Sequence, residues 1–286
     1  MTESDLSLLE GAREAAARRR DWDFVVLPGG YEAALRDLAA LGELHGAIGD
    51  FVSDAWLREI PGRPVKWVQV AQISRLEDGV NVTAPYQAMG RRAAETLIAG
   101  GSAHFAFVGA GGQFATRELA AGFGAEVGTR GFEWTSSTAV SAAHVQQFLR
   151  GLPRPVGVLA GSDRLARLVV GAARQLGWRC PQDVAVIGVG NQRLESVHAG
   201  LPLSSFELPG REMGRQAAEV LARLLDDEAI APGVYPVAGA PILHERESSL
   251  RQGRGVERAL AFARSRLDQP LQVSDLAREA GMSRRS

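Results

Sequence analysis

Short apolar runs alternate with amphipathic helical segments over about the first 250 residues, and this alternation restricts the fold more than any other feature. The apolar runs are too short for helices, whereas the segments between them repeat apolar residues with a helical period. Strands and crossover helices that recur every roughly 25–35 residues are typical of parallel βαβ units. The sequence therefore predicts an open α/β fold with parallel sheets flanked by helices. Because the alternation covers more than about 200 residues, we expect this fold to be divided into two lobes.

The same pattern gives the expected elements. Strands are expected at Trp22–Leu27, Ala47–Ile48, Val65–Val70, His104–Val108, Val156–Leu159 and Val184–Gly188. Helices are expected at Asp5–Arg19, Glu32–Leu41, Tyr86–Ala99, Ser141–Leu149, Arg164–Leu176 and Glu212–Leu225, and a further helix begins at Arg117–Phe123. Such a lobe usually opens with a strand, but this chain opens with a helix. Either that strand is missing or the start site is displaced, and the residues leave both open.

Composition excludes several classes of protein. The chain has 286 residues, 45% of them hydrophobic, which is enough to bury one large core or two modest ones. Its single cysteine, Cys180, excludes an intramolecular disulfide and a cysteine-rich zinc site. Met1–Arg20 lacks the apolar segment of a secretory signal, and no window is long and apolar enough for a membrane span. We therefore expect a soluble, cytoplasmic protein that does not engage a membrane.

Charge is distributed unevenly along the chain. The formal net charge is −1, yet Leu250–Ser286 holds eight arginines against four acidic residues. A basic tail on an acidic body indicates either a polyanion partner at the C-terminal end or an ordinary solvated helix. The strand–helix alternation ends at Arg246–Gly255, which is rich in serine, glycine and charged residues and which we expect to be a linker.

The residues after this linker follow the pattern of a helix-turn-helix. A first helix is expected at Val256–Leu267, and Val273, Leu276 and Ala277 form the apolar stripe of a second. Gly281 suits a tight turn and Ser283 suits the N-cap of a third helix. Arg284 and Arg285 then fall in its first turn, where side chains reach phosphates or base edges. The alternative is an ordinary corner between two helices.

This C-terminal segment resembles the opening of the DNA-binding domain of AraC/XylS-family regulators. The resemblance covers residues 255–286 and is carried by Asp-Leu-Ala-Arg-Glu-Ala-Gly-Met-Ser-Arg at residues 275–284. It implies DNA contacts by Ser283, Arg284 and Arg285. It also implies that the chain stops inside the first recognition helix, so that DNA is bound only through a complete parent protein.

The preceding part resembles the effector-binding domain of LacI/GalR-type regulators and periplasmic sugar-binding proteins. The motifs that carry it lie, in the family's order, at residues 89–97, 104–109, 117–123, 157–166, 180–191, 203–207 and 211–218. The resemblance implies a domain at 1–249, with one lobe of about 1–100 and 203–228 and another of about 101–202 and 229–249. A LacI-type sensor joined to an AraC-type reader is the arrangement of xylose-operon activators, which the whole chain resembles.

The resemblance also implies a site in which planar polar groups bind the hydroxyls of a small carbohydrate. Arg117 matches the family's hydroxyl-binding arginine, or it forms a surface ion pair with Glu118 or Glu126. Asp163, beside Ser162, matches an aspartate at a strand-to-helix turn, or it only caps the following helix. Further candidates for the ligand site are Asn191 and the aromatic walls Tyr86, Trp134 and Phe114, each of which is otherwise a core residue.

Two positions depart from the family's pattern. The family has an Asp-Asn pair before the helix that begins at Tyr86, where this chain has Pro85. It has Gly-x-Asp after the strand at Val184, where this chain has Gly190 followed by Asn191. Both lost carboxylates commonly accept sugar hydroxyls. The resemblance therefore predicts a small carbohydrate effector, with a xylose-like pentose as the first candidate, without fixing the sugar.

Other functions find less support in the sequence. Val108–Phe114 has two of the three glycines of a dinucleotide-binding turn, but Phe114 replaces the third. No phosphate-binding lysine loop, nucleophile elbow or zinc-binding histidine pair occurs, so we expect no enzyme, cofactor or metal. A periplasmic-type sugar-binding protein and a regulator that has lost its effector remain the alternatives to a cytoplasmic, homodimeric, DNA-binding transcription regulator.

Overall fold

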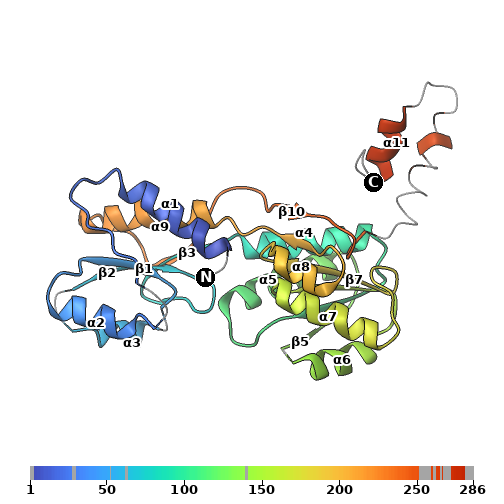
Figure 1. Cartoon of the computed structure of the whole chain (residues 1–286), viewed down its shortest axis with the longest axis horizontal. Coiled ribbons are helices and arrows are strands. Elements are labelled where there is room, and N and C mark those ends of the chain that lie inside the picture. The colour runs from blue at the N-terminus through green and yellow to red at the C-terminus, as the bar shows by residue number, and fades with distance from the viewer. Residues whose placement is uncertain are drawn as a thin grey trace. The chain divides into compact units, whose positions relative to one another are not determined.

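The computed structural model describes residues 3–27, 30–51, 53–61, 64–138, 141–250, 259, 262–264, 266 and 272–280 (Figure 1). The chain divides into two compact units, each made of three separate segments. Unit 1 comprises Met1–Arg91, Ala110–Phe123 and Glu207–Ile242. Unit 2 comprises Arg92–Gly109, Gly124–Phe206 and Leu243–Ser286.

Unit 1 is built on a parallel four-stranded sheet in the order β1-β2-β3-β9. Its strands are β1 (Gly46–Gly49), β2 (Lys66–Val70), β3 (Val80–Thr83) and β9 (Gly233–Pro236). Its helices are α1 (Glu3–Ala16), α2 (Glu32–Ala40), α3 (Asp54–Arg58) and α9 (Gly210–Leu225). All of β3 is buried, as expected for a parallel strand that is covered on both faces.

Helices α1 and α9 lie against each other in Figure 1 and form one helical layer of unit 1. Two glycines permit their close approach. A Cβ atom on Gly11 would lie 1.9 Å from the carbonyl oxygen of Arg211, and one on Gly214 would lie 1.9 Å from that of Leu8. Beneath this pair, α9 packs on β1, β2 and β3, so the layer closes one face of the sheet.

Unit 2 contains a six-stranded sheet in the order β10-β8-β7-β6-β4-β5, in which only β10 is antiparallel to its neighbour. Its strands are β4 (His104–Val108), β5 (Trp134–Ser137), β6 (Val156–Ala160), β7 (Val184–Val189), β8 (Ser204–Phe206) and β10 (Leu243–His244). Its helices include α6 (Ala142–Arg150), α7 (Asp163–Gln175), α8 (Arg193–Ala199) and α11 (Val273–Ala280). Helices α4 (Tyr86–Ala99) and α5 (Phe114–Thr129) contribute residues to both units.

The core of unit 2 explains why the central strands were visible in the sequence. Every residue of β6 and β7 is buried, and their valines pack against the apolar face of α7, which includes Leu165 and Val169. Continuous apolar runs of this kind are typical of parallel strands with helices on both faces. The predicted helix at Tyr86–Ala99 and strand at His104–Val108 are confirmed residue for residue.

One predicted strand is wrong. Trp22–Leu27 has no regular secondary structure. Its burial nevertheless alternates, because Trp22 and Phe24 are half-buried whereas Asp23 and Val25 are exposed. The segment has the residue pattern of a strand, but among the described residues it has no strand beside it with which to form a ladder.

The predicted linker at Arg246–Gly255 is also wrong over its first residues. Ser248 and Ser249 are buried. The Ser248 backbone accepts a 2.7 Å hydrogen bond from the amide of Val186, and the Ser248 hydroxyl donates one of 2.7 Å to the Val186 carbonyl. Residues 246–249 are thus part of unit 2, because serine hydroxyls and the main chain satisfy one another there.

The unit boundaries also differ from the predicted lobes, because residues 92–100 and 203–206 belong to unit 2 and residues 110–123 belong to unit 1. β9 pairs in parallel with β3, so residues 233–236 belong to unit 1, whereas the sequence analysis placed 229–249 in the second lobe. β9 is short and begins with glycine, so its sequence carries little strand signal.

The C-terminal segment is described only in part. The helix predicted around Leu276 is confirmed as α11. Leu276 and Ala277 are half-buried, but Val273, expected in the same apolar stripe, is 79% exposed at the first residue of the helix. The turn and N-cap predicted at Gly281 and Ser283, and the DNA contacts predicted for Arg284 and Arg285, lie outside the described residues.

No helix in the described part of the chain is long and apolar enough to span a membrane.

Candidate functional site

The carboxyl edge of the unit 2 sheet carries a cluster of polar side chains. Ser162 and Asp163 follow β6, and Asn191 follows β7. Ligands of open α/β sheets bind outside the carboxyl ends of the strands, because the loops there start helices and expose their amide groups. The neighbouring strands β6 and β7 therefore bring Asp163 and Asn191, which are about 30 residues apart in the sequence, to the same edge of the sheet.

Asp163 is held in place by two strong hydrogen bonds. Its Oδ1 accepts from the hydroxyl of Ser205 at 2.5 Å, and its Oδ2 accepts from the amide of Gln192 at 2.6 Å. The residue is 1% exposed. The hydroxyl of Ser162, not Asp163, caps α7, because it accepts from the amide of Leu165 at 3.3 Å. The interpretation of Asp163 as only a helix cap is therefore wrong.

Burial raises the pKa of the Asp163 carboxyl above its usual range. The hydrogen bonds from Ser205 and Gln192 and the charge of Arg246 act in the opposite direction, since they favour the carboxylate. The group is a fixed, partly desolvated acceptor at the start of a helix, and such an acceptor is suited to a neutral hydroxyl donor.

Asn191 is locked in an uncommon backbone conformation, with φ of 50°. The backbone amide of Asn191 donates a hydrogen bond to the Ser205 hydroxyl at 3.0 Å, and its side-chain Oδ1 accepts one from Nη2 of Arg246 at 2.6 Å. Nη1 of Arg246 donates to the Leu203 carbonyl at 2.6 Å. The sequence analysis missed Ser205 and Arg246 as site residues. Arg246 stood in the expected linker, and no local pattern connects it with Asn191.

The structure gives a physical reason for the glycines at the end of β7. A Cβ atom on Gly188 would lie 2.2 Å from Oδ1 of Asp163, so only glycine leaves room for that carboxylate. Gly190 has a φ of 124°, and a Cβ there would lie 3.6 Å from Oδ2 of Asp163. A carboxylate side chain at position 190 would thus lie close to the buried carboxylate of Asp163, and the two like charges would repel each other.

Unit 1 has its own polar cluster at the carboxyl edge of its sheet, which the sequence analysis missed. Asp50 follows β1 directly, and its Oδ2 accepts from the amide of Ile73 at 2.9 Å. Its Oδ1 accepts from Nε2 of Gln69 at 2.9 Å, and Gln69 is fully buried. Burial raises the pKa of the Asp50 carboxyl, and the amides of Ile73 and Ser74 oppose that shift. The signal available in the sequence was a lone aspartate directly after an apolar run.

Asp50 thereby fixes the loop on which α5 begins. The carbonyls of Ile73 and Gln72 accept hydrogen bonds of 2.8 and 2.9 Å from the amides of Phe114 and Ala115. Arg117 lies in the first turn of α5, and its Nη1 donates to the carbonyl of Gly112 at 3.1 Å. A chain of hydrogen bonds therefore leads from Asp50 to the turn that carries Arg117.

The carboxylates expected as alternative partners of Arg117 have other partners. Glu118 accepts a 2.8 Å hydrogen bond from Nε2 of Gln87, and Glu126 forms an ion pair with Arg130 at 2.9 Å. The hydrogen bond that the structure records for the Arg117 side chain goes to the main chain of its own loop.

The three predicted aromatic walls lie in different units: Phe114, which is 3% exposed, is in unit 1 with Tyr86, and Trp134 is in unit 2. Tyr86 is in unit 1, 4% exposed, and burial together with the charge of Asp50 raises the pKa of its phenol. Trp134 is in unit 2, where it pairs in register with Phe105 near the amino end of β4. Its ring lies against Gly124, at which a Cβ would come within 2.4 Å of it. Trp134 is therefore at the opposite edge of the sheet from Asp163 and Asn191, and its assignment to their site is wrong.

Among the described residues, no group of three or more histidine, cysteine, aspartate or glutamate side chains is placed to hold a metal ion.

Solved structures share this architecture. The chain superposes on the "transcriptional regulator CelR-cellobiose complex" with a TM-score of 0.71 at 22% identity, covering 86% of this chain and 79% of that one. It superposes on the "xylose-binding transcription activator xylR" with a TM-score of 0.70 at 23% identity, covering 99% and 77%. The fold is that of the two-lobed, periplasmic-binding-protein-like α/β class.

A sequence model described as "Periplasmic binding protein-like domain" matches residues 94–249. The chain belongs to this family. A curated relative, the "Xylose operon regulatory protein" of Escherichia coli K12, is 29% identical over 139 residues, which are 48% of this chain and 36% of the relative. The protein of the same name from Haemophilus influenzae is 32% identical over 103 residues, 36% of this chain and 26% of the relative. The matches thus span about a third of the curated relatives or less.

Proposed function

We propose that the protein is the sensor part of a DNA-binding transcription regulator and that its effector is a small carbohydrate. The match of residues 94–249 to the family carries this proposal, because that stretch contains Asp163, Asn191 and Arg246. Relatives named as xylose operon regulators and a neighbour described with cellobiose support a sugar as the ligand class. A xylose-like pentose is the first candidate.

The chemistry of the two carboxyl edges supports this ligand class. Sugar hydroxyls both donate and accept hydrogen bonds, so a sugar site needs planar acceptors and donors in fixed orientations. Asp163 offers an acceptor in unit 2, and Arg117 in unit 1 has guanidinium N–H groups beyond the one that contacts Gly112. We propose that these residues, with Ser162, Asn191 and Tyr86, bind the effector.

The remaining parts of the proposal concern the complete parent protein. A homodimer would place two AraC-type readers on two DNA half-sites, with Ser283, Arg284 and Arg285 at the DNA. Binding of the sugar would change the affinity for DNA by favouring one arrangement of the sensor over another. We infer a cytoplasmic regulator and no catalytic activity, in line with the regulators among the relatives.

Isothermal titration calorimetry with xylose, arabinose, ribose, glucose and cellobiose tests the proposal. We expect one pentose to bind, and Arg117→Ala to weaken that binding at least about tenfold, which is the value of one strong polar contact. Arg130→Ala, directly after the end of the same helix and paired with Glu126, is the matched control and should bind like the unchanged protein. Retained affinity in Arg117→Ala would refute the assignment of Arg117.

The same titration separates the alternatives. A folded protein that binds none of these sugars would favour a regulator that has lost its effector. Binding of a sugar together with failure of the complete parent protein to bind DNA would favour a periplasmic-type sugar-binding protein.

A further inference from the structure

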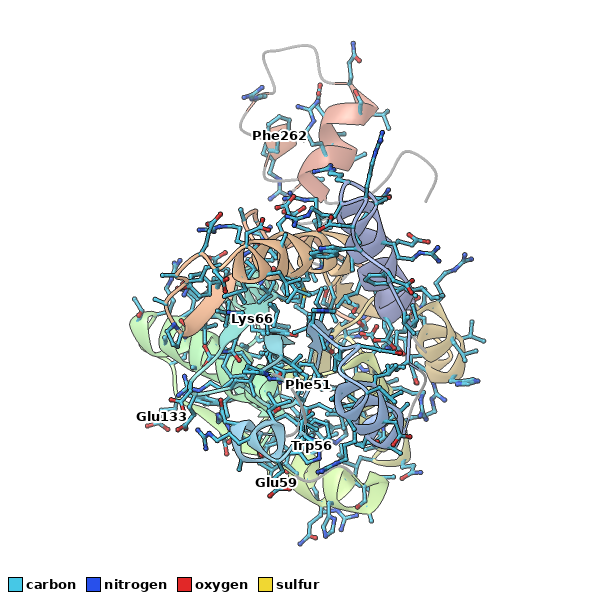
Figure 2. The ribbon with its side chains drawn as sticks, turned by 90° about the vertical axis from the view of Figure 1, so that its left-hand side faces the viewer. Phe51, Trp56, Glu59, Lys66, Glu133 and Phe262 are labelled. Carbon is cyan, nitrogen blue, oxygen red and sulfur yellow. The ribbon has the colours of Figure 1, made fainter. Side chains whose placement is uncertain are left out.

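The chain leaves the sheet of unit 2 through residues 246–250, which we call the connecting segment. Later in the sequence comes the tail with α11 and with Phe262, labelled in Figure 2, whose ring centroid lies 4.5 Å from Cζ of Arg266. The proposed function assigns DNA binding to this tail and effector binding to the cluster around Asp163. The connecting segment is the covalent link between the two.

The side chain of Arg246 joins the connecting segment to the ligand cluster. Its Nη2 donates to Oδ1 of Asn191 and its Nη1 donates to the carbonyl of Leu203, both at 2.6 Å. Its positive charge also favours the carboxylate of Asp163. Arg246 is half-buried, and a hydrogen bond in such surroundings is electrostatically stronger than the same bond in water.

The main chain of the same residue holds the connecting segment in place. The Arg246 amide donates to the Ser204 hydroxyl at 2.7 Å, and the Arg246 carbonyl accepts from that hydroxyl at 2.9 Å. The same carbonyl accepts from the amides of Ser249 and Leu250, both at 3.2 Å. Arg246 therefore contacts the ligand cluster with its side chain and the amides of the connecting segment with its carbonyl.

The orientation of the Asn191 carboxamide follows from its contact with Arg246. A guanidinium group donates hydrogen bonds and cannot accept them, so the oxygen of the carboxamide must face it. No hydrogen bond of the amino group, Nδ2, is found among the described residues. The backbone of Asn191 is meanwhile fixed by the Ser205 hydroxyl. An acceptor oxygen of a ligand can thus bind Nδ2 without displacing a contact of the cluster.

A ligand bound at Nδ2 changes the hydrogen bond at the other end of the same carboxamide. When the amino group of an amide donates a hydrogen bond, its oxygen becomes a better acceptor, because linked hydrogen bonds polarise one another. The bond between Asn191 and Arg246 is strengthened as a result. Arg246 is then held more firmly, together with the carbonyl that binds the amides of Ser249 and Leu250.

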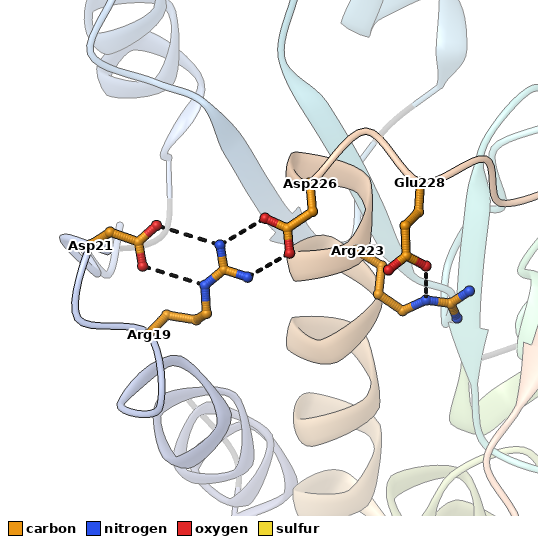
Figure 3. A network of polar contacts seen from close by, with 5 residues as sticks. All are labelled: Arg19, Asp21, Arg223, Asp226 and Glu228. Carbon is orange, nitrogen blue, oxygen red and sulfur yellow. Dashed lines mark hydrogen bonds and ion pairs between the residues drawn. The ribbon is translucent and has the colours of Figure 1, made fainter.

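The two partners of Arg246 are suited to such a change because both are neutral oxygens. Arg19 and Arg223, in contrast, pair with carboxylates: Arg19 binds Asp226 and Arg223 binds Glu228, each at 2.7 Å (Figure 3). A hydrogen bond between two charged groups is strong whether or not a ligand lies nearby. A carboxamide oxygen is a weaker acceptor, and its strength depends on what its own amino group binds.

We propose that Arg246 is a positioning residue that couples the effector site of unit 2 to the connecting segment. An acceptor oxygen of the effector binds Nδ2 of Asn191, the carboxamide oxygen holds Arg246 more tightly, and the amides of Ser249 and Leu250 become better protected. For the nature of the effector this inference rests on the proposed function, whereas the coupling between Asn191 and the connecting segment is a property of the chain itself.

A double-mutant cycle on the full chain measures the coupling without a ligand. Asn191→Gly removes the carboxamide and keeps the backbone, since glycine readily adopts a φ of 50°. Amide hydrogen exchange of Ser249 and Leu250 should accelerate at least about fivefold, because Arg246 loses one of its two partners. In Arg246→Met, which cannot donate these hydrogen bonds, Asn191→Gly should have no further effect. Additive effects of the two substitutions would overturn the proposal.

Further variants distinguish coupling from a general loss of stability. Asn191→Asp gives Arg246 a carboxylate partner, so exchange in the connecting segment should slow, but not when Arg246→Met is also present. Arg174→Met is the matched control, because Arg174 likewise donates to a main-chain carbonyl, that of Ala199 at 2.7 Å, and should leave the connecting segment unaffected. Equal acceleration at Leu159, inside β6, in Asn191→Gly would overturn the proposal, since the substitution would then weaken the whole unit.

Titration with xylose, arabinose, ribose, glucose and cellobiose separates this inference from the proposed function. A sugar that binds should slow exchange in the connecting segment at least about threefold in the unchanged chain and in Arg174→Met, but not in Arg246→Met. Binding without that change would overturn the coupling but not the carbohydrate effector. If none of the five sugars binds, the proposed function loses its ligand class, and the double-mutant cycle alone decides on Arg246.

Discussion

Asp163 is the residue on which most of the unit 2 cluster depends. Its two oxygens fix Ser205 and the amide of Gln192, and its carboxylate fills the space that a side chain at Gly188 would need. The sequence placed Asp163 and Asn191 correctly at the ends of strands, because a strand-to-helix turn is a local pattern. It did not show Ser205 or Arg246, which approach from about 40 or more residues away in the chain.

The raised pKa of Asp163 predicts how the cluster responds to pH. The pKa of the Asp163 carboxyl is higher in the folded state than in the unfolded state, so protonation stabilises the folded state. This stabilisation is complete at pH values below the ordinary aspartate pKa of about 3.9, and it is lost as pH rises through the folded-state pKa. As pH rises above the ordinary aspartate pKa, the unchanged protein should therefore lose free energy of unfolding relative to Asp163→Asn. Urea unfolding at several pH values measures the difference.

Asp183→Asn is the control of opposite sign. The amide and guanidinium of Arg179 lower the pKa of the Asp183 carboxyl, so its contribution is present above the ordinary value and is lost as pH falls through its folded pKa. The two variants should deviate from the unchanged protein in opposite directions. Parallel pH profiles for both would contradict the assignment of Asp163.

Gly188 provides a prediction on stability. In Gly188→Ala the new methyl group would lie 2.2 Å from Oδ1 of Asp163, so the carboxylate has to move away from Ser205. We expect a loss of about 1–3 kcal/mol in the free energy of unfolding, as for other overpacked buried sites. Gly171→Ala, in α7 with no atom within 4 Å of the added carbon, should instead gain about 0.5–1 kcal/mol. An unchanged free energy of unfolding in Gly188→Ala would show that β7 can shift away from Asp163 without loss of stability.

At the scale of elements, the sequence predicted best those strands and helices that can be identified from their own residues, without knowledge of the elements packed against them. β6, β7 and α7 carry complete apolar patterns and were found to within one or two residues. Trp22–Leu27 has an equally good pattern but is no strand, because a ladder needs a partner and β1 does not provide it. The strands β3, β5, β8, β9 and β10 and the helices α3 and α8 were missed, since they are short and rely on long-range contacts.

The α1–α9 layer gives a prediction at this scale. Gly214→Ala places a carbon 1.9 Å from the carbonyl oxygen of Leu8, and a backbone atom cannot rotate out of the way. The helices must separate, and we expect a loss of about 1–3 kcal/mol in a urea unfolding experiment. Gly128→Ala in α5, with no atom within 4 Å of the added carbon, should be neutral or stabilising by up to about 1 kcal/mol. Similar losses in both variants would argue against close helix packing as the cause.

At the scale of the whole molecule, the division into two lobes was predictable but its details were not. The alternation of strands and helices indicated the class of fold, whereas the position of β9 in unit 1 and of residues 246–249 in unit 2 depends on contacts that no local pattern reveals. The last of these is directly testable by shortening the chain.

A chain that ends after Leu250 should unfold at nearly the same urea concentration as the 286-residue chain, as measured by far-ultraviolet circular dichroism. A chain that ends after Glu245 should lose about 2 kcal/mol or more, because it leaves the amides of Val186 and Ser204 without their acceptors on Ser248. Equal stability of the two shortened chains would mean that residues 246–249 are a linker after all.

The three-segment make-up of each unit also sets an order on synthesis. Five of the six strands of unit 2 lie within residues 104–206, so they have all been made before β9 of unit 1 leaves the ribosome. β9 must then pair with β3, about 150 residues earlier in the chain. Unit 2 can thus gain most of its structure during translation, while the sheet of unit 1 waits for β9, the last of its four described strands. Substitutions that weaken β3 or β9 should accordingly lower the yield of folded protein more than its final stability suggests.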